Sequence, residues 1–166
     1  GYLASKEMMI PMRSMLASAG FDAHIAQLPP LLLGKVEPMA GLLASEVDRI
    51  TGRHPDGICD LIGVSLGGLL GLRYLQRFDD HRRVSRFVTI GTPFLGSRAA
   101  RAAALLLGRI SPAARQLMPG SDFIQTLNSE GLPGNVEALS ISATRDKLAP
   151  PSACTLEGAR NVELLG

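Results

Sequence analysis

The sequence lacks the features that mark metal-binding, membrane-spanning and nucleic-acid-binding chains. It holds two cysteines, Cys59 and Cys154, and no CxxC pair or His/Cys cluster with the spacing of a zinc site. No apolar run approaches the roughly 18 residues of a membrane span. The formal net charge is only +2, and the basic residues lack the interleaved aromatic residues of a single-strand nucleic-acid binder. We therefore expect no metal ion, no organic cofactor and no nucleic-acid partner.

The residues that are present indicate one globular domain, covering residues 1–166. They are 46% hydrophobic and 19% charged, a balance typical of a chain that buries a core. The chain begins with Gly-Tyr rather than Met, so we expect its true start to lie upstream. The composition leaves the compartment and the oligomeric state open.

Hydrophobic periodicity predicts helices and strands that alternate along the chain. The first helix carries a methionine-rich stripe, with a cap at Ser5 and a stop at Gly20. Helical patterns cover residues 8–16, 36–51, 66–78, 97–109 and 121–128, the last beginning at a Ser/Asp cap. Strand patterns cover residues 21–29, 58–64, 84–91, 136–143 and 161–166. The alternation predicts an α/β fold with a predominantly parallel sheet flanked by helices.

A strand joins an amphipathic helix directly between Cys59 and Phe78. The strand is a nearly continuous apolar run, as expected where a parallel sheet is covered on both faces. Its turn reads GVSLGG (63–68), and we expect Ser65 to stand there with a strained backbone, with no room for a Cβ at Gly63 or Gly67. The alternative interpretation is a glycine-rich strand-to-helix turn that is only packed tightly.

Four stretches of the chain, in this order, resemble bacterial lipases and esterases of the α/β-hydrolase superfamily. They read IGVSLGG (62–68), TIGTPFLGS (89–97), MPGSDFIQTLN (118–128) and ISATRDKLAPP (141–151). The resemblance implies the α/β-hydrolase fold, truncated here at both ends, and a small helical cap inserted at residues 92–135. It also implies hydrolysis of carboxylic esters through a Ser-His-Asp triad.

The resemblance carries roles to particular residues. Ser65 matches the nucleophile, in an elbow with Gly63, Gly67 and Gly68. Asp146 matches the acid, because it follows a strand and precedes Pro150-Pro151. The N–H groups of Leu66 and Tyr2 match the oxyanion hole. Four other acids fit less well, because they fall inside a strand, in a charged turn or at a helix cap: Asp60, Asp79, Asp80 and Asp122.

The base of the triad is missing from its expected place. The family order is Ser, Asp, His, and no histidine follows Asp146. His24 falls in an early strand pattern, His54 in a loop and His81 in a charged turn, and none of them fits the role. We expect the chain to be an internal piece of a longer protein, with the histidine beyond Gly166, and to be inactive as an esterase by itself.

The substrate is less defined than the chemistry. The resemblance implies a small ester or a lipid, and the Ala/Leu/Arg-rich stretch 97–109 is consistent with a transient contact between the cap and a lipid interface. An ordinary core helix would show the same pattern. Two alternatives stay open at this point: a lipase-like domain that binds without turnover, and an acyltransferase or amidase on the same fold.

Overall fold

A four-stranded parallel sheet forms the centre of the molecule. The computed structural model describes residues 9–29, 35–79, 82–97 and 112–165. Strands β1 (Cys59–Val64), β2 (Val84–Ile90), β3 (Glu137–Ala143) and β4 (Arg160–Leu164) lie side by side in chain order, and every neighbouring pair is parallel. The predicted parallel α/β sheet is therefore confirmed. Because all strands run the same way, the residues that follow them meet at one edge.

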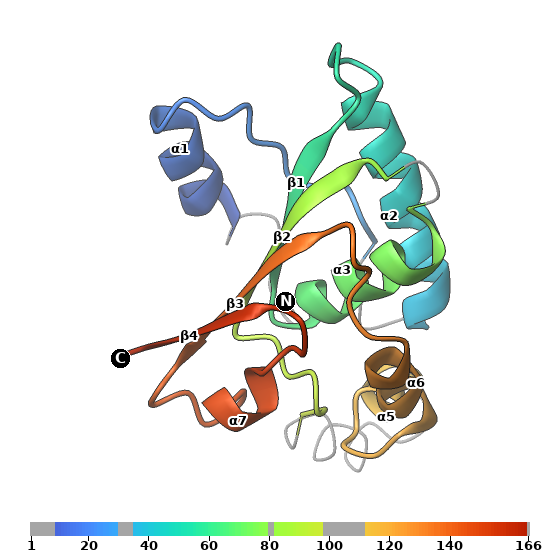
Figure 1. Cartoon of the computed structure of the whole chain (residues 1–166), viewed down its shortest axis with the longest axis vertical. Coiled ribbons are helices and arrows are strands. Elements are labelled where there is room, and N and C mark those ends of the chain that lie inside the picture. Colours follow the sequence, from blue (N-terminus) through green and yellow to red (C-terminus); the bar gives the residue numbers. More distant parts are fainter. Residues whose placement is uncertain (1–8, 30–34, 80–81, 98–111, 166) are drawn as a thin grey trace.

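Helices connect and cover these strands (Figure 1). The longer ones are α1 (Ile10–Ser18), α2 (Val36–Thr51), α3 (Leu66–Arg77) and α6 (Asp122–Glu130), close to the predicted ranges. Two short helices, α5 (Pro112–Gln116) and α7 (Pro151–Cys154), were not predicted. Most of the helix predicted at 97–109 lies outside the described residues. None of the helices in the described ranges is long and apolar enough to cross a membrane.

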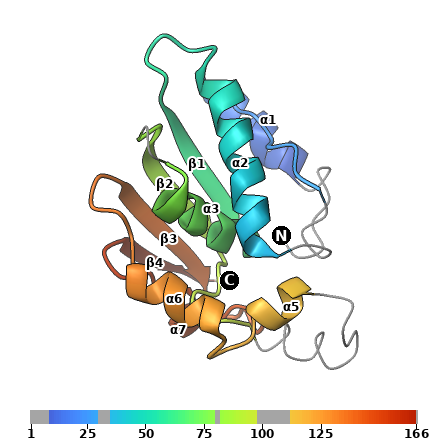
Figure 2. The ribbon, with the colours of Figure 1, turned by 90° about the vertical axis from the view of Figure 1, so that its right-hand side faces the viewer.

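The main core lies between the sheet and α3. Figures 1 and 2 show α2, α3 and α6 on one side of the sheet and α1 on the other. On the α3 side Phe87 is fully buried, and a Cβ added to Gly71 of α3 would lie only 2.7 Å from its ring. The opposite face of the sheet is only half-buried at Ile62, Val64 and Val88. The expectation that β1 is covered on both faces is thus wrong for the described structure, because α1 alone lies on that side.

The first part of the chain departs most from prediction. Residues 21–29 pair with no strand among the described residues, so the strand predicted there is wrong. This segment is attached through side chains instead: the Gln27 N–H donates to a Glu46 carboxylate oxygen at 3.0 Å. Helix α1 buries none of its residues, and Met15 is 63% exposed, so the methionine stripe faces no described core. The predicted stop is present, since Gly20 has φ +91°.

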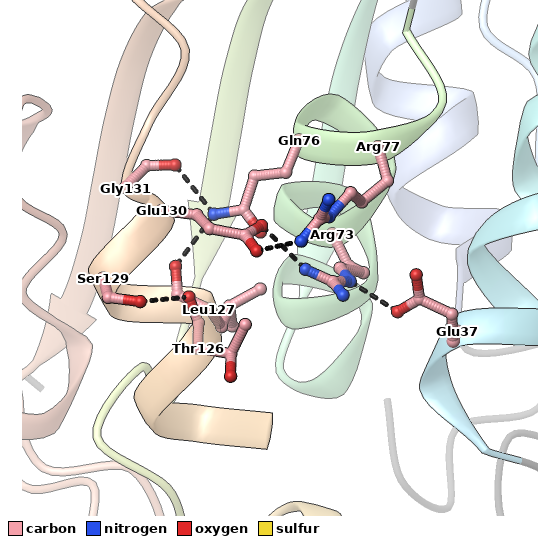
Figure 3. A network of polar contacts seen from close by, with 9 residues as sticks. All are labelled: Glu37, Arg73, Gln76, Arg77, Thr126, Leu127, Ser129, Glu130 and Gly131. Atoms are coloured by element: carbon pink, nitrogen blue, oxygen red, sulfur yellow. Dashed lines mark hydrogen bonds and ion pairs between the residues drawn. The ribbon is translucent and has the colours of Figure 1, made fainter. Parts of the chain in front are cut away.

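A polar network fixes α6 to α3 and α2 (Figure 3). The Arg73 guanidinium, with its side chain only 10% exposed, pairs with Glu37 of α2 and, at 2.8 Å, with Glu130 at the end of α6. Arg77, one turn further along α3, also pairs with Glu130. The Gln76 amide donates to the Leu127 and Gly131 carbonyl oxygens, both at 2.8 Å, which satisfies carbonyl groups at the α6 C-terminus. The helix ahead of β3 is thereby held against the helix that follows β1.

Replacing Arg73 tests how much this network contributes to stability. We expect Arg73→Met to lower the free energy of unfolding by about 1–3 kcal/mol, because Glu37 and Glu130 lose a largely desolvated partner. Arg77→Met is the matched control: it removes the same charge from the same helix, but at a side chain that is 48% exposed. Its expected cost is below about 1 kcal/mol. Urea unfolding followed by circular dichroism measures both, and equal losses would show that burial of Arg73 is not what matters.

Candidate active site

Ser65 occupies the turn between β1 and α3 in a strained conformation. Its φ is 52° and its ψ is −124°, a region that residues with a Cβ rarely adopt. It stands at the N-cap position of α3, yet its side chain makes no capping hydrogen bond. Serine at this position normally accepts a hydrogen bond from the first turn of the helix. The backbone of Ser65 therefore carries a conformational cost, while its hydroxyl makes no capping hydrogen bond.

Two glycines make room for this turn: Gly63, as predicted, and Gly68 in place of the predicted Gly67. A Cβ on Gly63 would lie 2.6 Å from Gly68 Cα, so the elbow closes only without one. A Cβ on Gly68 would lie 2.1 Å from Thr92 Oγ1. A Cβ on Gly67 would meet no atom within 4 Å. The expected clash at Gly67 is wrong, because the first turn of α3 presents this residue away from β1 and β2.

The end of β2 holds the turn in place. The Ser65 N–H donates to the Ile90 carbonyl oxygen at 2.8 Å, and the Thr92 hydroxyl donates to the Ser65 carbonyl oxygen at 3.0 Å. Thr92 is fully buried, so this donor is not in competition with water. Thr92 belongs to the stretch TIGTPFLGS (89–97), but the sequence predicted no role for it. Its tight contact with Gly68, far away in sequence, could not be read from the local pattern.

Asp146 lies at the same edge of the sheet as Ser65, as the sequence predicted. It follows β3, and β2 alone separates β3 from β1. One carboxylate oxygen, Oδ1, accepts the N–H groups of Leu148 and Ala149 at 2.8 and 2.9 Å. The other, Oδ2, would be 3.6 Å from a Cβ on Gly91, directly after β2, and accepts no hydrogen bond from the described residues. The loop thus fixes the carboxylate and leaves one oxygen available toward β2.

Of the two predicted oxyanion donors, Leu66 is described by the structure and Tyr2 is not. Leu66 is the first residue of α3, so its N–H has no carbonyl group one turn back within the helix. This N–H lies at the positive end of the helix dipole, where negative charge is stabilised. Tyr2 lies outside the described residues, so its predicted role remains a prediction.

The structure places the described histidines away from this edge. His54 precedes β1, whose six residues span roughly 20 Å, whereas Ser65 follows it. His24 lies beside His54, with the ring centroids 6.4 Å apart. Both pair with the Asp22 carboxylate, at 3.1 Å for His24 and 3.5 Å for His54. Neither can bridge Ser65 and Asp146, and His81 lies outside the described residues.

Of the other candidate acids, Asp60 and Asp79 have structural partners, Asp122 lies at the start of a helix, and Asp80 lies outside the described residues. Asp60 accepts the Ser85 hydroxyl at 3.0 Å. Asp79 accepts the Tyr74 hydroxyl at 3.0 Å and the Arg83 N–H at 2.7 Å, which orders the turn before β2. Asp122 begins α6, where Ser121 provides the cap through the Ile124 N–H at 3.3 Å. The predicted Ser/Asp cap is therefore made by the serine.

The cysteines do not offer an alternative nucleophile. Burial raises the pKa of both the Cys59 and the Cys154 thiol to about 11. At neutral pH both are therefore protonated, and the thiolate is the reactive form of cysteine.

In the segment 92–135, hydrogen bonds join the described residues on either side of 98–111. Phe94 is fully buried, and its carbonyl oxygen accepts the Asn128 amide at 2.8 Å. The Ser97 N–H donates to the Leu117 carbonyl oxygen at 2.9 Å. Figure 1 shows α5 and α6 next to each other. Residues 98–111, which include the Arg-rich part of the cap predicted at 92–135, lie outside the described residues. The cap therefore stays a prediction.

The fold is shared with lipases and esterases of known structure. The chain matches no family model and no curated protein at a significant level. A lipase of Bacillus licheniformis in its mature form superposes with TM-score 0.65 at 17% identity, over 79% of this chain and 66% of that one. A monoacylglycerol lipase of Paleococcus ferrophilus superposes with TM-score 0.68 at 15% identity, over 100% of this chain and 82% of that one. Lipase B of Aspergillus fumigatus gives 0.66 at 22% identity, over 79% and 34%. The chain therefore has the α/β-hydrolase fold, and spans 66% and 34% of the Bacillus and Aspergillus lipases.

Alanine substitutions at two glycines test the geometry of the turn. We expect Gly63→Ala to lower the free energy of unfolding by at least about 1–3 kcal/mol, because the new methyl group meets backbone atoms that have no flexible side chain to move. Gly67→Ala is the matched control. It adds a methyl group to open space at the start of α3, and we expect no loss and a gain of up to about 1 kcal/mol from helix propensity. Chemical unfolding measures both, and comparable destabilisation would contradict the described turn.

Proposed function

We propose that this chain carries the nucleophile and the acid of a serine hydrolase that acts on carboxylic esters. The observation that carries the proposal is the conformation of Ser65. It has a positive backbone φ at a helix N-cap, and its hydroxyl makes no capping hydrogen bond. Asp146 supports it, with a fixed carboxylate on the same edge of the sheet. The lipases and esterases that share the fold support the choice of reaction.

The chemistry follows from these groups. Ser65 Oγ attacks the ester carbonyl carbon, and its proton passes to an imidazole base. The carbonyl oxygen becomes an oxyanion, which accepts the Leu66 N–H and, in the proposal, the Tyr2 N–H. The alkoxide leaving group takes the proton from the imidazolium. Water then attacks the acyl-serine by the same steps and releases the acid. The negative charge of Asp146 orients the imidazole and stabilises its protonated form.

The imidazole base is not among the described histidines. In the proposal it comes from a residue beyond Gly166, next to the Asp146 loop. This placement is consistent with β4, which runs parallel to β3 and ends at the same edge as Asp146. Its contact with that loop is direct, since the Thr144 N–H donates to the Leu164 carbonyl oxygen at 3.0 Å.

The proposal specifies the type of reaction but only a broad class of substrate. A small ester or a lipid is the proposed substrate class, with the segment at 92–135 as the proposed cap. An amide or an acyl-transfer substrate would use the same Ser65, and only the assay separates them. A domain that binds without turnover would not need a strained serine with an uncommitted hydroxyl, because strain of this kind costs about 1–3 kcal/mol.

An activity assay on two lengths of the protein tests the proposal. We expect the 166-residue chain to release no p-nitrophenol from a short-chain p-nitrophenyl ester above the uncatalysed rate. A longer product of the same gene, carrying a histidine after Gly166, is expected to hydrolyse it. In that protein Ser65→Ala should lower kcat by about 10⁶-fold and Asp146→Asn by about 10⁴-fold.

Asp60→Asn is the matched control, because it removes a carboxylate from β1 at a residue that, among the described residues, pairs with Ser85 and Arg86. We expect its kcat to stay within about twofold of the parent value, since surface substitutions rarely alter the folded state. Turnover by the 166-residue chain would mean that one of its own histidines is the base. A longer protein that folds but transforms no ester, amide or acyl-transfer substrate would leave Ser65 as a turn residue.

A further inference from the structure

Three metal-ligating side chains meet at the edge of the sheet opposite Ser65. Asp22 and His24 come from the irregular segment 21–29, and His54 comes from the loop between α2 and β1. One ligand atom from each lies within 4.8 Å of the other two. The sequence pattern gave no reason to expect this, because 29 residues lie between His24 and His54. None of the three has a part in the proposed ester chemistry.

From this convergence we infer that Asp22, His24 and His54 bind a divalent transition-metal ion, with zinc the best fit. Two imidazoles and one carboxylate are a ligand set that zinc takes with three protein ligands and open positions for water. Hard ions such as Mg²⁺ prefer an all-oxygen shell and would not select two imidazoles.

Two of the three distances between ligand atoms already suit a shared ion, and all three are within 4.8 Å. Zinc bonds of about 2.0–2.1 Å in a tetrahedron separate ligand atoms by roughly 3.3 Å. The His24 Nε2 to Asp22 Oδ1 distance is 3.1 Å, and the His54 Nε2 to Asp22 Oδ2 distance is 3.5 Å. The second of these is too long for a strong hydrogen bond between the two groups alone. Both imidazoles present the same ring nitrogen to one carboxylate, as two ligands of a shared ion would.

Access and solvent also fit the proposal. The Asp22 side chain is 66% exposed, and those of His24 and His54 are 35% and 37% exposed, so water can complete the coordination shell. His24 also borders an open hollow of about 380 Å³, with Ile10 and Arg49 among its other lining residues. An ion therefore reaches the cluster without any rearrangement of the core.

A bound ion would join two segments that have no regular structure. Residues 21–29 form no strand, and residues 52–57 are turns. A link from His24 to His54 closes a loop around α2, and closing a loop of this length restricts the unfolded chain. The inferred role is stabilisation of the amino edge of the sheet. It does not depend on the proposed function, since β1 separates this cluster from Ser65.

Zinc titration of the metal-free protein tests the inference. The protein is treated with EDTA, dialysed, and titrated with Zn²⁺ in a calorimeter and with Co²⁺ by visible absorption. We expect one ion per chain, with tetrahedral Co²⁺ bands. Asp22→Asn, His24→Gln and His54→Gln should each weaken binding at least about tenfold. Zinc at 100 times its dissociation constant should shift the unfolding equilibrium about 100-fold toward the folded state.

Asp56→Asn is the matched control, because it removes an exposed carboxylate from the same loop as His54 without touching the cluster. It should bind zinc like the parent protein, and so should Ser65→Ala. Absence of stoichiometric binding would overturn the inference. Equal weakening by Asp56→Asn and Asp22→Asn would overturn it too, because it would show general attraction of cations to the surface. Urea midpoints without metal confirm that each variant is folded.

Discussion

The hydrogen bond from the buried Thr92 hydroxyl to the Ser65 carbonyl oxygen is the contact on which the carboxyl edge of the sheet depends. It ties the strained turn after β1 to the end of β2, beside the Ser65 N–H bond to Ile90. A positive φ at a residue with a Cβ costs about 1–3 kcal/mol, so the turn persists only where its surroundings fix it. Gly68 allows Thr92 to come this close, and any larger residue there would separate the two strands' ends.

β2 is the common support of both candidate catalytic residues. Its carboxyl end receives the Ser65 turn on one side and faces the Asp146 carboxylate across Gly91 on the other. Gly91 has φ +56°, and its N–H donates to the Ile141 carbonyl oxygen at 2.8 Å, which continues the β2–β3 register past the strand. The spacing of Ser65 and Asp146 is therefore set by the pairing of β1, β2 and β3. Helix α3 packs on this sheet with Gly71 against Phe87, and the polar network at Arg73 joins it to α2 and α6.

The two candidate sites lie at opposite edges of the sheet. The carboxyl edge carries Ser65 and Asp146, and the amino edge carries the cluster of Asp22, His24 and His54. A parallel sheet keeps these groups apart by the length of its strands, so a change at one edge need not affect the other. Because of this separation, the proposed ester turnover and the inferred zinc binding can be tested independently on one protein. It also keeps the two described histidines, His24 and His54, away from Ser65.

The sequence by itself determined the features that depend on near neighbours: the alternation of helices and strands, the turn at Ser65, a helix cap at Ser121 or Asp122, and the loop position of Asp146. Each follows from periodicity or from backbone preferences over a few residues. Only the tertiary structure decided that Gly68 rather than Gly67 is constrained, that residues 21–29 form no strand, and that His24 meets His54. These outcomes depend on which distant segments pack together, and local residue preferences carry no information about that contact.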